Sequence, residues 1–265
     1  MRSTINSLTV HTYGNKKKQP IIFIHGFPFD YKMWCNHLEA LSENYFCIAY
    51  DVRGLGESYV GDGQYTMEFF VDDLYSIMHE MSLNNPILCG MSMGGYIALR
   101  AVERDQSRFK ALILMDTKSE ADNDEGKIKR AAAINEINTN GLNYFLEGFI
   151  TNCFSPATIK NSPEKFERIL ERAKKQDPVG VKGCLLAMIS RTDTTDYLQK
   201  IKIPTLLMVG ENDTLTPPEV MKDMAAQIDE SEFAPIPHAG HMAPVENPGV
   251  VNNIIASFLE RRFKK

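Results

Sequence analysis

The feature that most restricts the fold is a regular alternation of short apolar runs with helical patterns. The apolar runs lie at residues 20–25, 46–50, 86–90 and 111–115, and the helical patterns between them lie at 34–41, 67–81 and 93–103. Strands that are covered on both faces need such continuous apolar runs. The alternation therefore predicts an α/β fold with a mostly parallel, doubly wound sheet. Residues 7–13 alternate enough to form its opening edge strand.

The alternation stops near residue 118 and resumes near residue 201. Between these points the patterns are helical and no strand is evident; helices are expected near 125–139, 142–152, 163–176 and 179–191. The resumed alternation predicts a strand at 204–210, a helix at 219–228, a strand at 232–236 and a helix at 250–263. We predict one α/β core, residues 1–117 and 201–265, interrupted by a helical cap at 118–200.

One serine lies in a glycine-rich turn between a predicted strand and a predicted helix, in the sequence GMSMGG at residues 90–95. A serine hydroxyl attacks an acyl carbon only if it stands clear of the sheet, where a base can reach it. A sharp strand-to-helix turn achieves this but crowds the backbone, which explains the glycines two positions before and after Ser92. An ordinary turn with small residues has the same pattern. The assignment of Ser92 as the nucleophile therefore depends on whether the chain also supplies a base and an acid.

The predicted base is His241. Its loop, PHAGHMAP at residues 237–244, follows the last strand and should emerge at the carboxyl edge of the sheet. Ligand sites of open parallel sheets lie at that edge, so a base there can reach Ser92. His238 shares the loop and is the alternative, but it lies so close to the strand that we expect it to support the loop. The other histidines (11, 25, 37 and 79) lie on or at the end of predicted elements.

The base needs an acid that fixes its tautomer and stabilises the imidazolium form. Asp213 follows the strand at 204–210, again at the carboxyl edge, and is the predicted acid. Asp116 ends the strand at 111–115 and competes for this role, although it could instead cap the segment that opens the lid. Glu211 is closer to its strand, and we expect it to point elsewhere.

An oxyanion hole needs two N–H donors. The helix that begins at Met93 offers its first free amide. The segment HGFP at residues 25–28 follows the strand expected beside the nucleophile strand, and Gly26 permits the unusual backbone of a donor turn. The amide of Phe27 is therefore the second predicted donor, and His25 is expected to support this turn rather than to act as a base.

Together these segments resemble the α/β-hydrolase superfamily over nearly the whole chain. The matching segments are HGFP at 25–28, DVRGLGES at 51–58, GMSMGG at 90–95, GEND at 210–213 and HAGH at 238–241. The resemblance implies the chain order Ser92, Asp213, His241 and a structural role for DVRGLGES. The stretch MDTKSEAD at 115–122 is similar to one in 3-oxoadipate enol-lactonases and small carboxylesterases. Ser92 departs from haloalkane dehalogenases and epoxide hydrolases, whose pattern demands an aspartate at that position.

The residues and the resemblance predict a serine hydrolase that cleaves a small or medium ester or lactone through an acyl-enzyme. This chemistry needs no metal and no organic cofactor. Four alternatives stay open: a carbon–carbon hydrolase, a perhydrolase and a hydroxynitrile lyase that use the same triad, and a ligand-sensing protein of the same fold.

Apolar side chains recur at helical spacing in the predicted cap. We expect Phe145, Phe149 and Met188 to line the substrate pocket, although packing between cap and core would produce the same pattern. An apolar lid predicts a largely apolar acyl substrate. Lys118 and Arg191 could meet a substrate carboxylate, but we interpret both as surface charges.

Charge and composition narrow the partners. A net charge of −5 gives no reason to expect binding to nucleic acid or to an anionic membrane. The first thirty residues lack a basic region followed by a long apolar run, so we expect a cytoplasmic enzyme. The five cysteines show no CxxC spacing, which predicts buried reduced thiols. The sequence does not predict an oligomeric state.

Overall fold

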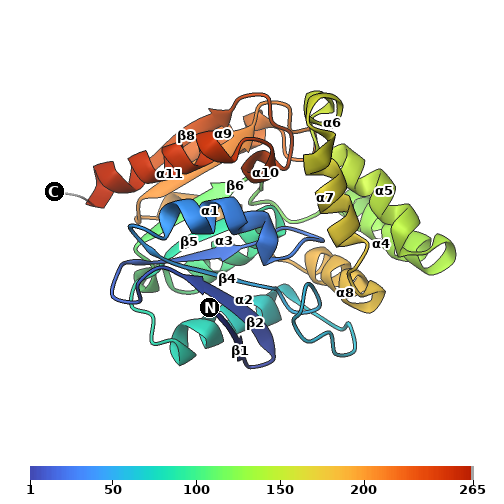
Figure 1. Cartoon of the computed structure of the whole chain (residues 1–265), viewed down its shortest axis with the longest axis horizontal. Helices are drawn as coiled ribbons and strands as arrows, with labels where there is room; N and C mark the ends of the chain where they lie inside the picture. Colours follow the sequence, from blue (N-terminus) through green and yellow to red (C-terminus); the bar gives the residue numbers. More distant parts are fainter. Residues whose placement is uncertain (264–265) are drawn as a thin grey trace.

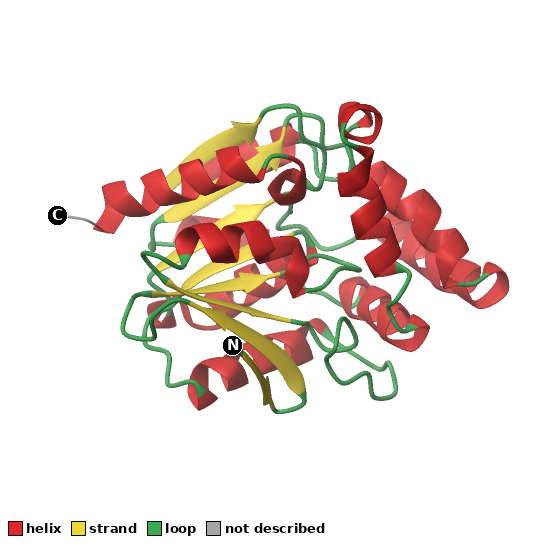
Figure 2. Ribbon diagram, in the orientation of Figure 1, coloured by secondary structure: helices red, strands yellow, loops and turns green. Residues whose placement is uncertain are grey.

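The computed structural model describes residues 1–263, and within them the strands form one eight-stranded sheet (Figures 1 and 2). The strands are β1 (Arg2–Ile5), β2 (Leu8–Tyr13), β3 (Pro20–Ile24), β4 (Phe46–Tyr50), β5 (Ile87–Met91), β6 (Ala111–Met115), β7 (Thr205–Gly210) and β8 (Ser231–Ile236). Their order is β1-β2-β4-β3-β5-β6-β7-β8, and all neighbours from β4 to β8 are parallel. The predicted mostly parallel sheet is confirmed.

The central strands are buried along their whole length. Every residue of β4, β5, β6 and β7 is buried, in agreement with their almost entirely apolar sequences. Because β5, β7 and β8 run parallel, their carboxyl ends lie along one edge of the sheet. The loops that follow these three strands therefore meet at that edge.

The amino-terminal part of the sheet differs from the prediction. The segment expected as an edge strand at 7–13 is not at the edge, because β2 pairs antiparallel with both β1 and β4. The edge is β1, whose residues alternate between exposed and half-buried positions. Its sequence, RSTI, contains no apolar run that would reveal a strand.

The core helices cover both faces of the sheet. They are α1 (Cys35–Leu41), α2 (Met67–Glu80), α3 (Met93–Asp105), α9 (Pro218–Ala226), α10 (Ala243–Glu246) and α11 (Pro248–Phe263), and the chain also forms the short 3₁₀ helices η1 (Tyr31–Trp34), η2 (Gln106–Arg108) and η3 (Thr195–Lys200). α1 packs against α11 on one face, and α2 packs against α3 on the other (Figure 1).

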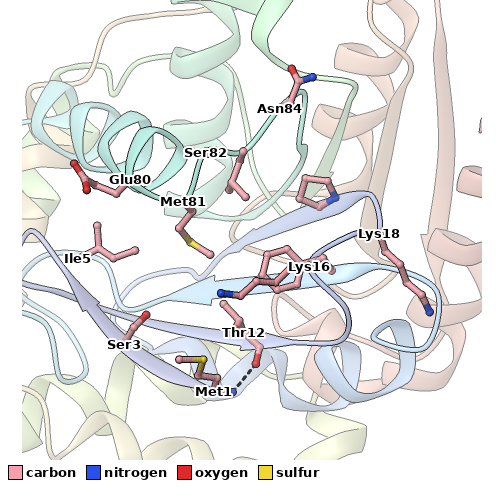
Figure 3. A pocket seen from close by; sticks show the side chains of 13 residues that line it. Met1, Ser3, Ile5, Thr12, Lys16, Lys18, Glu80, Met81, Ser82 and Asn84 are labelled. Carbon is pink, nitrogen blue, oxygen red and sulfur yellow. Dashed lines mark hydrogen bonds between the residues drawn. The ribbon is translucent and has the colours of Figure 1, made fainter.

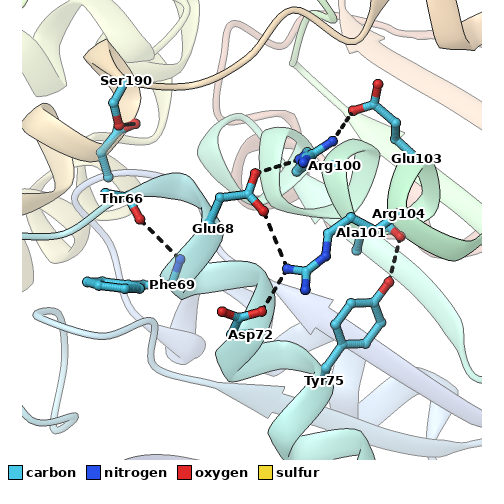
Figure 4. Close-up of polar contacts among 11 residues, drawn as sticks. Thr66, Glu68, Phe69, Asp72, Tyr75, Arg100, Ala101, Glu103, Arg104 and Ser190 are labelled. Atoms are coloured by element: carbon cyan, nitrogen blue, oxygen red, sulfur yellow. Dashed lines mark hydrogen bonds and ion pairs between the residues drawn. The ribbon is translucent and has the colours of Figure 1, made fainter.

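A polar network ties α2 to α3 (Figure 4). Arg100 and Arg104 of α3 form ion pairs with Glu68 of α2, and the Tyr75 hydroxyl donates to the carbonyl of Ala101 at 2.8 Å. These ionic groups are partly exposed, so each pair contributes at most about 1 kcal/mol. The network adds a directional link between α2 and the helix that follows the candidate nucleophile.

Five helices form an insert between β6 and β7, beyond the carboxyl ends of the strands (Figure 1). They are α4 (Asp124–Asn140), α5 (Leu142–Cys153), α6 (Pro156–Asn161), α7 (Pro163–Ala173) and α8 (Pro178–Ile189). Residues 118–200 are all described and contain no strand, as predicted. The prediction missed α6, because six residues are too few for a recognisable helical repeat. The cap boundaries at 118 and 200 stay a prediction.

Two further features concern the chain as a whole. All five cysteines are free, and four of them are buried, as expected of reduced thiols. In the part of the chain that the structure describes, no helix has both the length and the apolar character needed to cross a lipid bilayer.

Candidate active site

Ser92 lies at the sharp turn between β5 and α3. Its backbone has φ 53° and ψ −117°, a conformation that a non-glycine residue rarely adopts. The turn is held by hydrogen bonds on both sides: the Ser92 N–H donates to the carbonyl of Met115 at 2.9 Å, and the Thr117 hydroxyl donates to the carbonyl of Ser92 at 2.9 Å. A Cβ atom at Gly94 would lie 2.2 Å from the carbonyl oxygen of Ile24, so only glycine fits there.

His241 reaches this serine from the loop between β8 and α10. Its Nε2 atom lies 2.9 Å from Ser92 Oγ, and its Nδ1 atom lies 2.8 Å from Asp213 Oδ2. His241 and Asp213 are buried, at 4% and 3% exposure. The structure therefore brings the three residues predicted from the sequence into one continuous chain of hydrogen bonds.

Asp213 is surrounded by donors. Its Oδ1 atom accepts the N–H groups of Leu215 at 2.8 Å and Thr216 at 3.0 Å, and its Oδ2 atom accepts the Thr216 hydroxyl at 2.6 Å. Burial alone would raise the pKa of Asp213, but the nearby His241 and the hydrogen bonds from His241 and Thr216 hold it below its usual value. The carboxyl group is therefore ionised at neutral pH and can orient the imidazole.

Thr216 is a site residue that the sequence prediction missed. Besides its bond to Asp213, its hydroxyl lies 3.2 Å from His241 Nδ1. The available signal was the spacing, because a threonine three positions after an aspartate commonly forms such a local turn.

The alternative residues occupy other places. His238 is exposed with φ 59°, and its N–H donates to a carboxylate oxygen of Glu211 at 3.3 Å, so both residues stabilise the loop away from Ser92. Asp116 is fully buried, and its Oδ1 atom accepts the N–H of Gly210 at 2.8 Å. His241 Nδ1 donates its hydrogen bond to Asp213 rather than to Asp116.

A second missed residue, Glu246, joins the His241 loop to the insert. Its Oε1 atom accepts the N–H of Gly240 at 2.8 Å, and its Oε2 atom accepts the N–H of Ser155 at 2.9 Å. The N–H of Met242 also donates to the carbonyl of Cys153 at 3.1 Å. The loop that carries His241 is thus hydrogen bonded to the segment between α5 and α6. The sequence carried no signal for it, because the burial of a glutamate cannot be read from its neighbours.

The segment predicted to complete an oxyanion hole passes directly beside Ser92. A Cβ atom on Gly26 would lie 2.6 Å from Met91 Sδ and 3.2 Å from Ser92 Cβ, so a larger residue would fit here only if these neighbours shifted. His25 supports the turn: its Nδ1 bonds the carbonyl of Gly26 at 2.9 Å, and its Nε2 accepts the N–H of Val52 at 2.9 Å. Burial lowers the pKa of His25, consistent with a neutral, structural ring.

The first residue of α3 is Met93, so its N–H has no carbonyl acceptor within its own helix. Met93 adjoins Ser92 in the chain at the start of α3, whereas Phe27 follows Gly26, in the turn beyond the neighbouring strand β3. The two amides remain the predicted oxyanion donors.

Aromatic rings from the insert meet this turn. The Phe27 ring lies 5.5 Å from that of Phe149 and 6.4 Å from that of Phe145, and these two insert rings stack at 5.5 Å. Phe145 and Phe149 also line a groove of about 680 Å³ between α4 and α5. Met188 is buried beside α4, where its sulfur contacts Arg130 Nη1 at 3.2 Å. Their role as substrate contacts stays a prediction.

One interpretation of the sequence was wrong. Arg191 is not a surface charge, since its side chain is 2% exposed. It pairs with Asp122 at 2.9 Å, donates to the carbonyl of Glu120 at 2.7 Å and lies 4.2 Å from the centre of the Tyr96 ring. A guanidinium can be buried when a carboxylate, carbonyls and an aromatic face replace its water. Lys118, at 30% side-chain exposure, lies 3.8 Å from the same Asp122.

Another hollow lies at the opposite edge of the sheet (Figure 3). It has a volume of about 510 Å³ and is lined by Pro20 and Phe46, which begin β3 and β4. Ligand sites of parallel sheets lie at the carboxyl ends of the strands, so this hollow is not the candidate site. No group of three or more His, Cys, Asp or Glu side chains among residues 1–263 is arranged to hold a metal ion.

Comparisons with known proteins agree with this fold. The family model described as alpha/beta hydrolase fold matches residues 19–248. A solved structure of a thermophilic esterase from Thermogutta terrifontis, with malate bound, is similar with a TM-score of 0.94 and 34% identity, covering 98% of each chain.

Two relatives with named activities cover nearly the same length. The 3-oxoadipate enol-lactonase 2 of Acinetobacter baylyi is 25% identical over 255 residues, which are 96% of this chain and 94% of that protein. A putative non-heme chloroperoxidase of Synechocystis is 28% identical over 271 residues, which are 96% of this chain and 97% of that protein. Relatives that share this fold thus carry different activities.

Proposed function

The chain belongs to the α/β-hydrolase family, and from this premise we propose that it is a serine hydrolase that cleaves carboxylic esters or lactones through an acyl-enzyme on Ser92. The observation that carries the proposal is the hydrogen-bonded series Ser92, His241, Asp213, with links of 2.9 Å and 2.8 Å. A hydroxyl in contact with an imidazole that a buried carboxylate orients is the arrangement needed for nucleophilic catalysis.

The reaction proceeds in two halves. His241 Nε2 accepts the proton of Ser92 Oγ while this oxygen attacks the substrate carbonyl carbon, and the carbonyl electron pair moves to the oxygen. Collapse of the tetrahedral intermediate breaks the bond to the leaving alkoxide, which takes the proton from His241. Water then attacks the acyl-enzyme with His241 as base, which releases the acid and restores the Ser92 hydroxyl.

The N–H groups of Phe27 and Met93 are proposed to bind the oxyanion. Support comes from the position of the Gly26 turn beside Ser92 and from the free amino end of α3. Loss of one such donor typically lowers turnover by about 10²–10³. The strained backbone of Ser92 is held by two hydrogen bonds from outside the turn, which fix the start of α3 before substrate arrives.

The substrate is proposed to be a small or medium ester or lactone with a largely apolar acyl group. Phe27, Phe145 and Phe149 form an aromatic cluster next to the proposed oxyanion site, and two of these rings also line the groove between α4 and α5. The esterase and enol-lactonase named above support this class of bond. We take the substrate as a small molecule and propose no cofactor.

Labelling with a fluorophosphonate tests the proposal, because this reagent phosphonylates only an activated serine. We expect one adduct on Ser92 in the wild-type protein and none in Ser92→Ala. Ester hydrolysis should fall by about 10⁶ in kcat in that variant. An adduct on another serine, or unchanged hydrolysis in Ser92→Ala, would refute the assignment.

The same triad supports a second reaction, which the relative named as a chloroperoxidase brings into consideration. If hydrogen peroxide replaces water in the second half of the reaction, the product is a peracid. Assays with p-nitrophenyl esters and lactones, with and without peroxide, distinguish the two. We expect the carboxylic acid to remain the main product when peroxide is added; a peracid as the main product would favour perhydrolysis.

A further inference from the structure

We propose that Asp116 is a neutral carboxylic acid that donates a hydrogen bond to the Asp213 carboxylate and so positions it against His241. This inference rests on the proposed function, because it takes Asp213 to be the acid that orients His241. It makes Asp116 a positioning residue, which acts through Asp213 and does not touch the reacting atoms.

The geometry of Asp116 leaves one of its oxygen atoms without a donor. The residue follows β6 with φ 45°, and its N–H donates to the carbonyl of Met208 at 3.0 Å. Its Oδ1 atom accepts the N–H of Gly210 at 2.8 Å. Its Oδ2 atom is equally buried, but no N–H or O–H group of the described residues donates to it.

The neighbour of this carboxyl group is another carboxyl group. The side chains of Asp116 and Asp213 interact directly, and two carboxyl groups can hydrogen bond to each other only if one of them carries a proton. Asp213 already accepts hydrogen bonds from Leu215, Thr216 and His241, which favour its ionised form. The proton therefore belongs to Asp116, where it also gives Oδ2 a partner.

The electrostatic surroundings agree with this placement. Burial raises the pKa of Asp116 well above its usual value, and the negative charges of Asp213 and Glu246 raise it further, while the Gly210 N–H opposes them. Around this pair lie His241 from the loop after β8, Glu246 from α10 and the buried Cys153 of α5, whose own pKa burial raises.

The extra donor has a consequence for His241. An O–H from Asp116 draws charge from the Asp213 carboxylate, which then stabilises the imidazolium form less strongly. Without this donor, the Asp213 carboxylate would bind the imidazolium form more tightly. The acid limb of the pH profile of kcat/KM, which reports loss of the free base, would then move to higher pH.

Two variants at Asp116 test whether the hydrogen-bond donor itself is needed. In Asp116→Asn, the amide oxygen can accept from Gly210 and the amide nitrogen can donate to Asp213, as the neutral acid does. Asp116→Ala removes both the acceptor for Gly210 and the donor to Asp213. We expect Asp116→Asn to retain kcat/KM within about 3-fold, and Asp116→Ala to lose about 10-fold in kcat with little change in KM.

The pH profile of kcat/KM distinguishes this role from a purely structural one, because loss of a purely structural side chain would leave the profile unchanged. In Asp116→Ala the acid limb should shift upward by about half a pH unit, whereas Asp116→Asn should keep the wild-type limb. A wild-type profile in Asp116→Ala, or an equal loss in both variants, would overturn the proposal.

A direct test detects the proton itself. Infrared spectra of the wild-type protein at pH 8 should show the carbonyl band of a protonated carboxyl group, and Asp116→Asn should lack it. The matched control is Glu246→Gln, which removes another buried carboxyl group and should keep the band. Absence of this carbonyl band from the wild type, or loss of the band only in Glu246→Gln, would contradict the proposal. Because this readout does not need turnover, it stands even if Ser92 is not labelled and the proposed function fails.

Discussion

The sheet and the insert contribute to the candidate site in different ways. From the sheet come Ser92, Asp213 and His241, which are joined by hydrogen bonds of 2.9 Å and 2.8 Å. From the insert come Phe145 and Phe149, whose rings meet Phe27 at centroid distances of 6.4 Å and 5.5 Å. Hydrogen bonds restrict direction as well as distance, whereas ring contacts tolerate displacement. We infer that the sheet fixes the chemistry and that the insert selects the substrate.

Burial separates the two regions in the same way. α3 buries nine of its 13 residues, whereas α4 in the insert buries only Ile137 of its 17. A helix with few buried apolar residues separates from the rest of the fold at a lower free-energy cost. Glu246 bridges the regions, because its carboxylate accepts one N–H from the His241 loop and one from the segment after α5.

The largest effect is expected on the sheet side. Asp213→Asn should leave the fold intact but lower kcat by about 10⁴, because an amide at this position favours the wrong tautomer of His241. The measurement is steady-state hydrolysis of a p-nitrophenyl ester, with Glu211→Gln on the same loop as the control. A kcat within 10-fold of wild type would show that the sheet side does not set the chemistry.

The next effect is the contribution of Asp116 to the pH dependence of the free energy of unfolding. Its pKa in the folded state is raised above the ordinary value of 3.8, so its contribution to stability is complete below that pH and is lost as the pH rises. Asn does not titrate. As the pH rises, the free energy of unfolding of the wild type should therefore fall relative to that of Asp116→Asn, by up to about 1.4 kcal/mol per pH unit. Urea unfolding at pH 5, 6 and 7 measures this; a constant difference would contradict it.

The link between the regions should have an intermediate effect. Glu246→Gln keeps one acceptor oxygen but turns an amide NH₂ toward the N–H of Gly240 or Ser155. We expect kcat to fall about 10-fold because His241 is less firmly held. Glu232→Gln, which alters a surface ion pair on β8, is the control and should change little. Unchanged kcat in Glu246→Gln would mean that the insert and the His241 loop are independent.

The smallest effect is expected from the insert. Phe149→Ala should raise KM for a p-nitrophenyl hexanoate by about 5-fold and leave kcat for the acetate nearly unchanged, because only the longer acyl chain would contact the ring. Phe69→Ala, which truncates an exposed ring on α2, is the control. Equal losses for both esters would show that the insert ring acts on the chemistry rather than on selection.

Local sequence patterns predicted the parts of the molecule that a short segment determines. The apolar runs gave the buried strands, and the glycine spacing around Ser92 gave the turn before α3. The strand order then brought His241 and Asp213 to the same edge. The choice of His241 over His238 followed from distance along the loop, and the structure places only His241 beside Ser92.

Features that depend on contacts between distant segments were missed. Glu246 meets Gly240 and Ser155, which lie on different parts of the chain, and nothing near residue 246 indicates its burial. Arg191 was interpreted as a surface charge because its partner Asp122 lies 69 positions away. The neutral state of Asp116 depends on a second carboxyl group brought close by the fold.

The most direct test of the central claim is to trap the acyl-enzyme. The protein should be mixed with excess p-nitrophenyl ester, quenched with acid during the initial burst and examined by intact-mass and peptide-mapping mass spectrometry. We predict one acyl group per chain, attached to Ser92, and its absence in Ser92→Ala. Product formation at the wild-type rate in Ser92→Ala, or the acyl group on any other residue, would contradict the account.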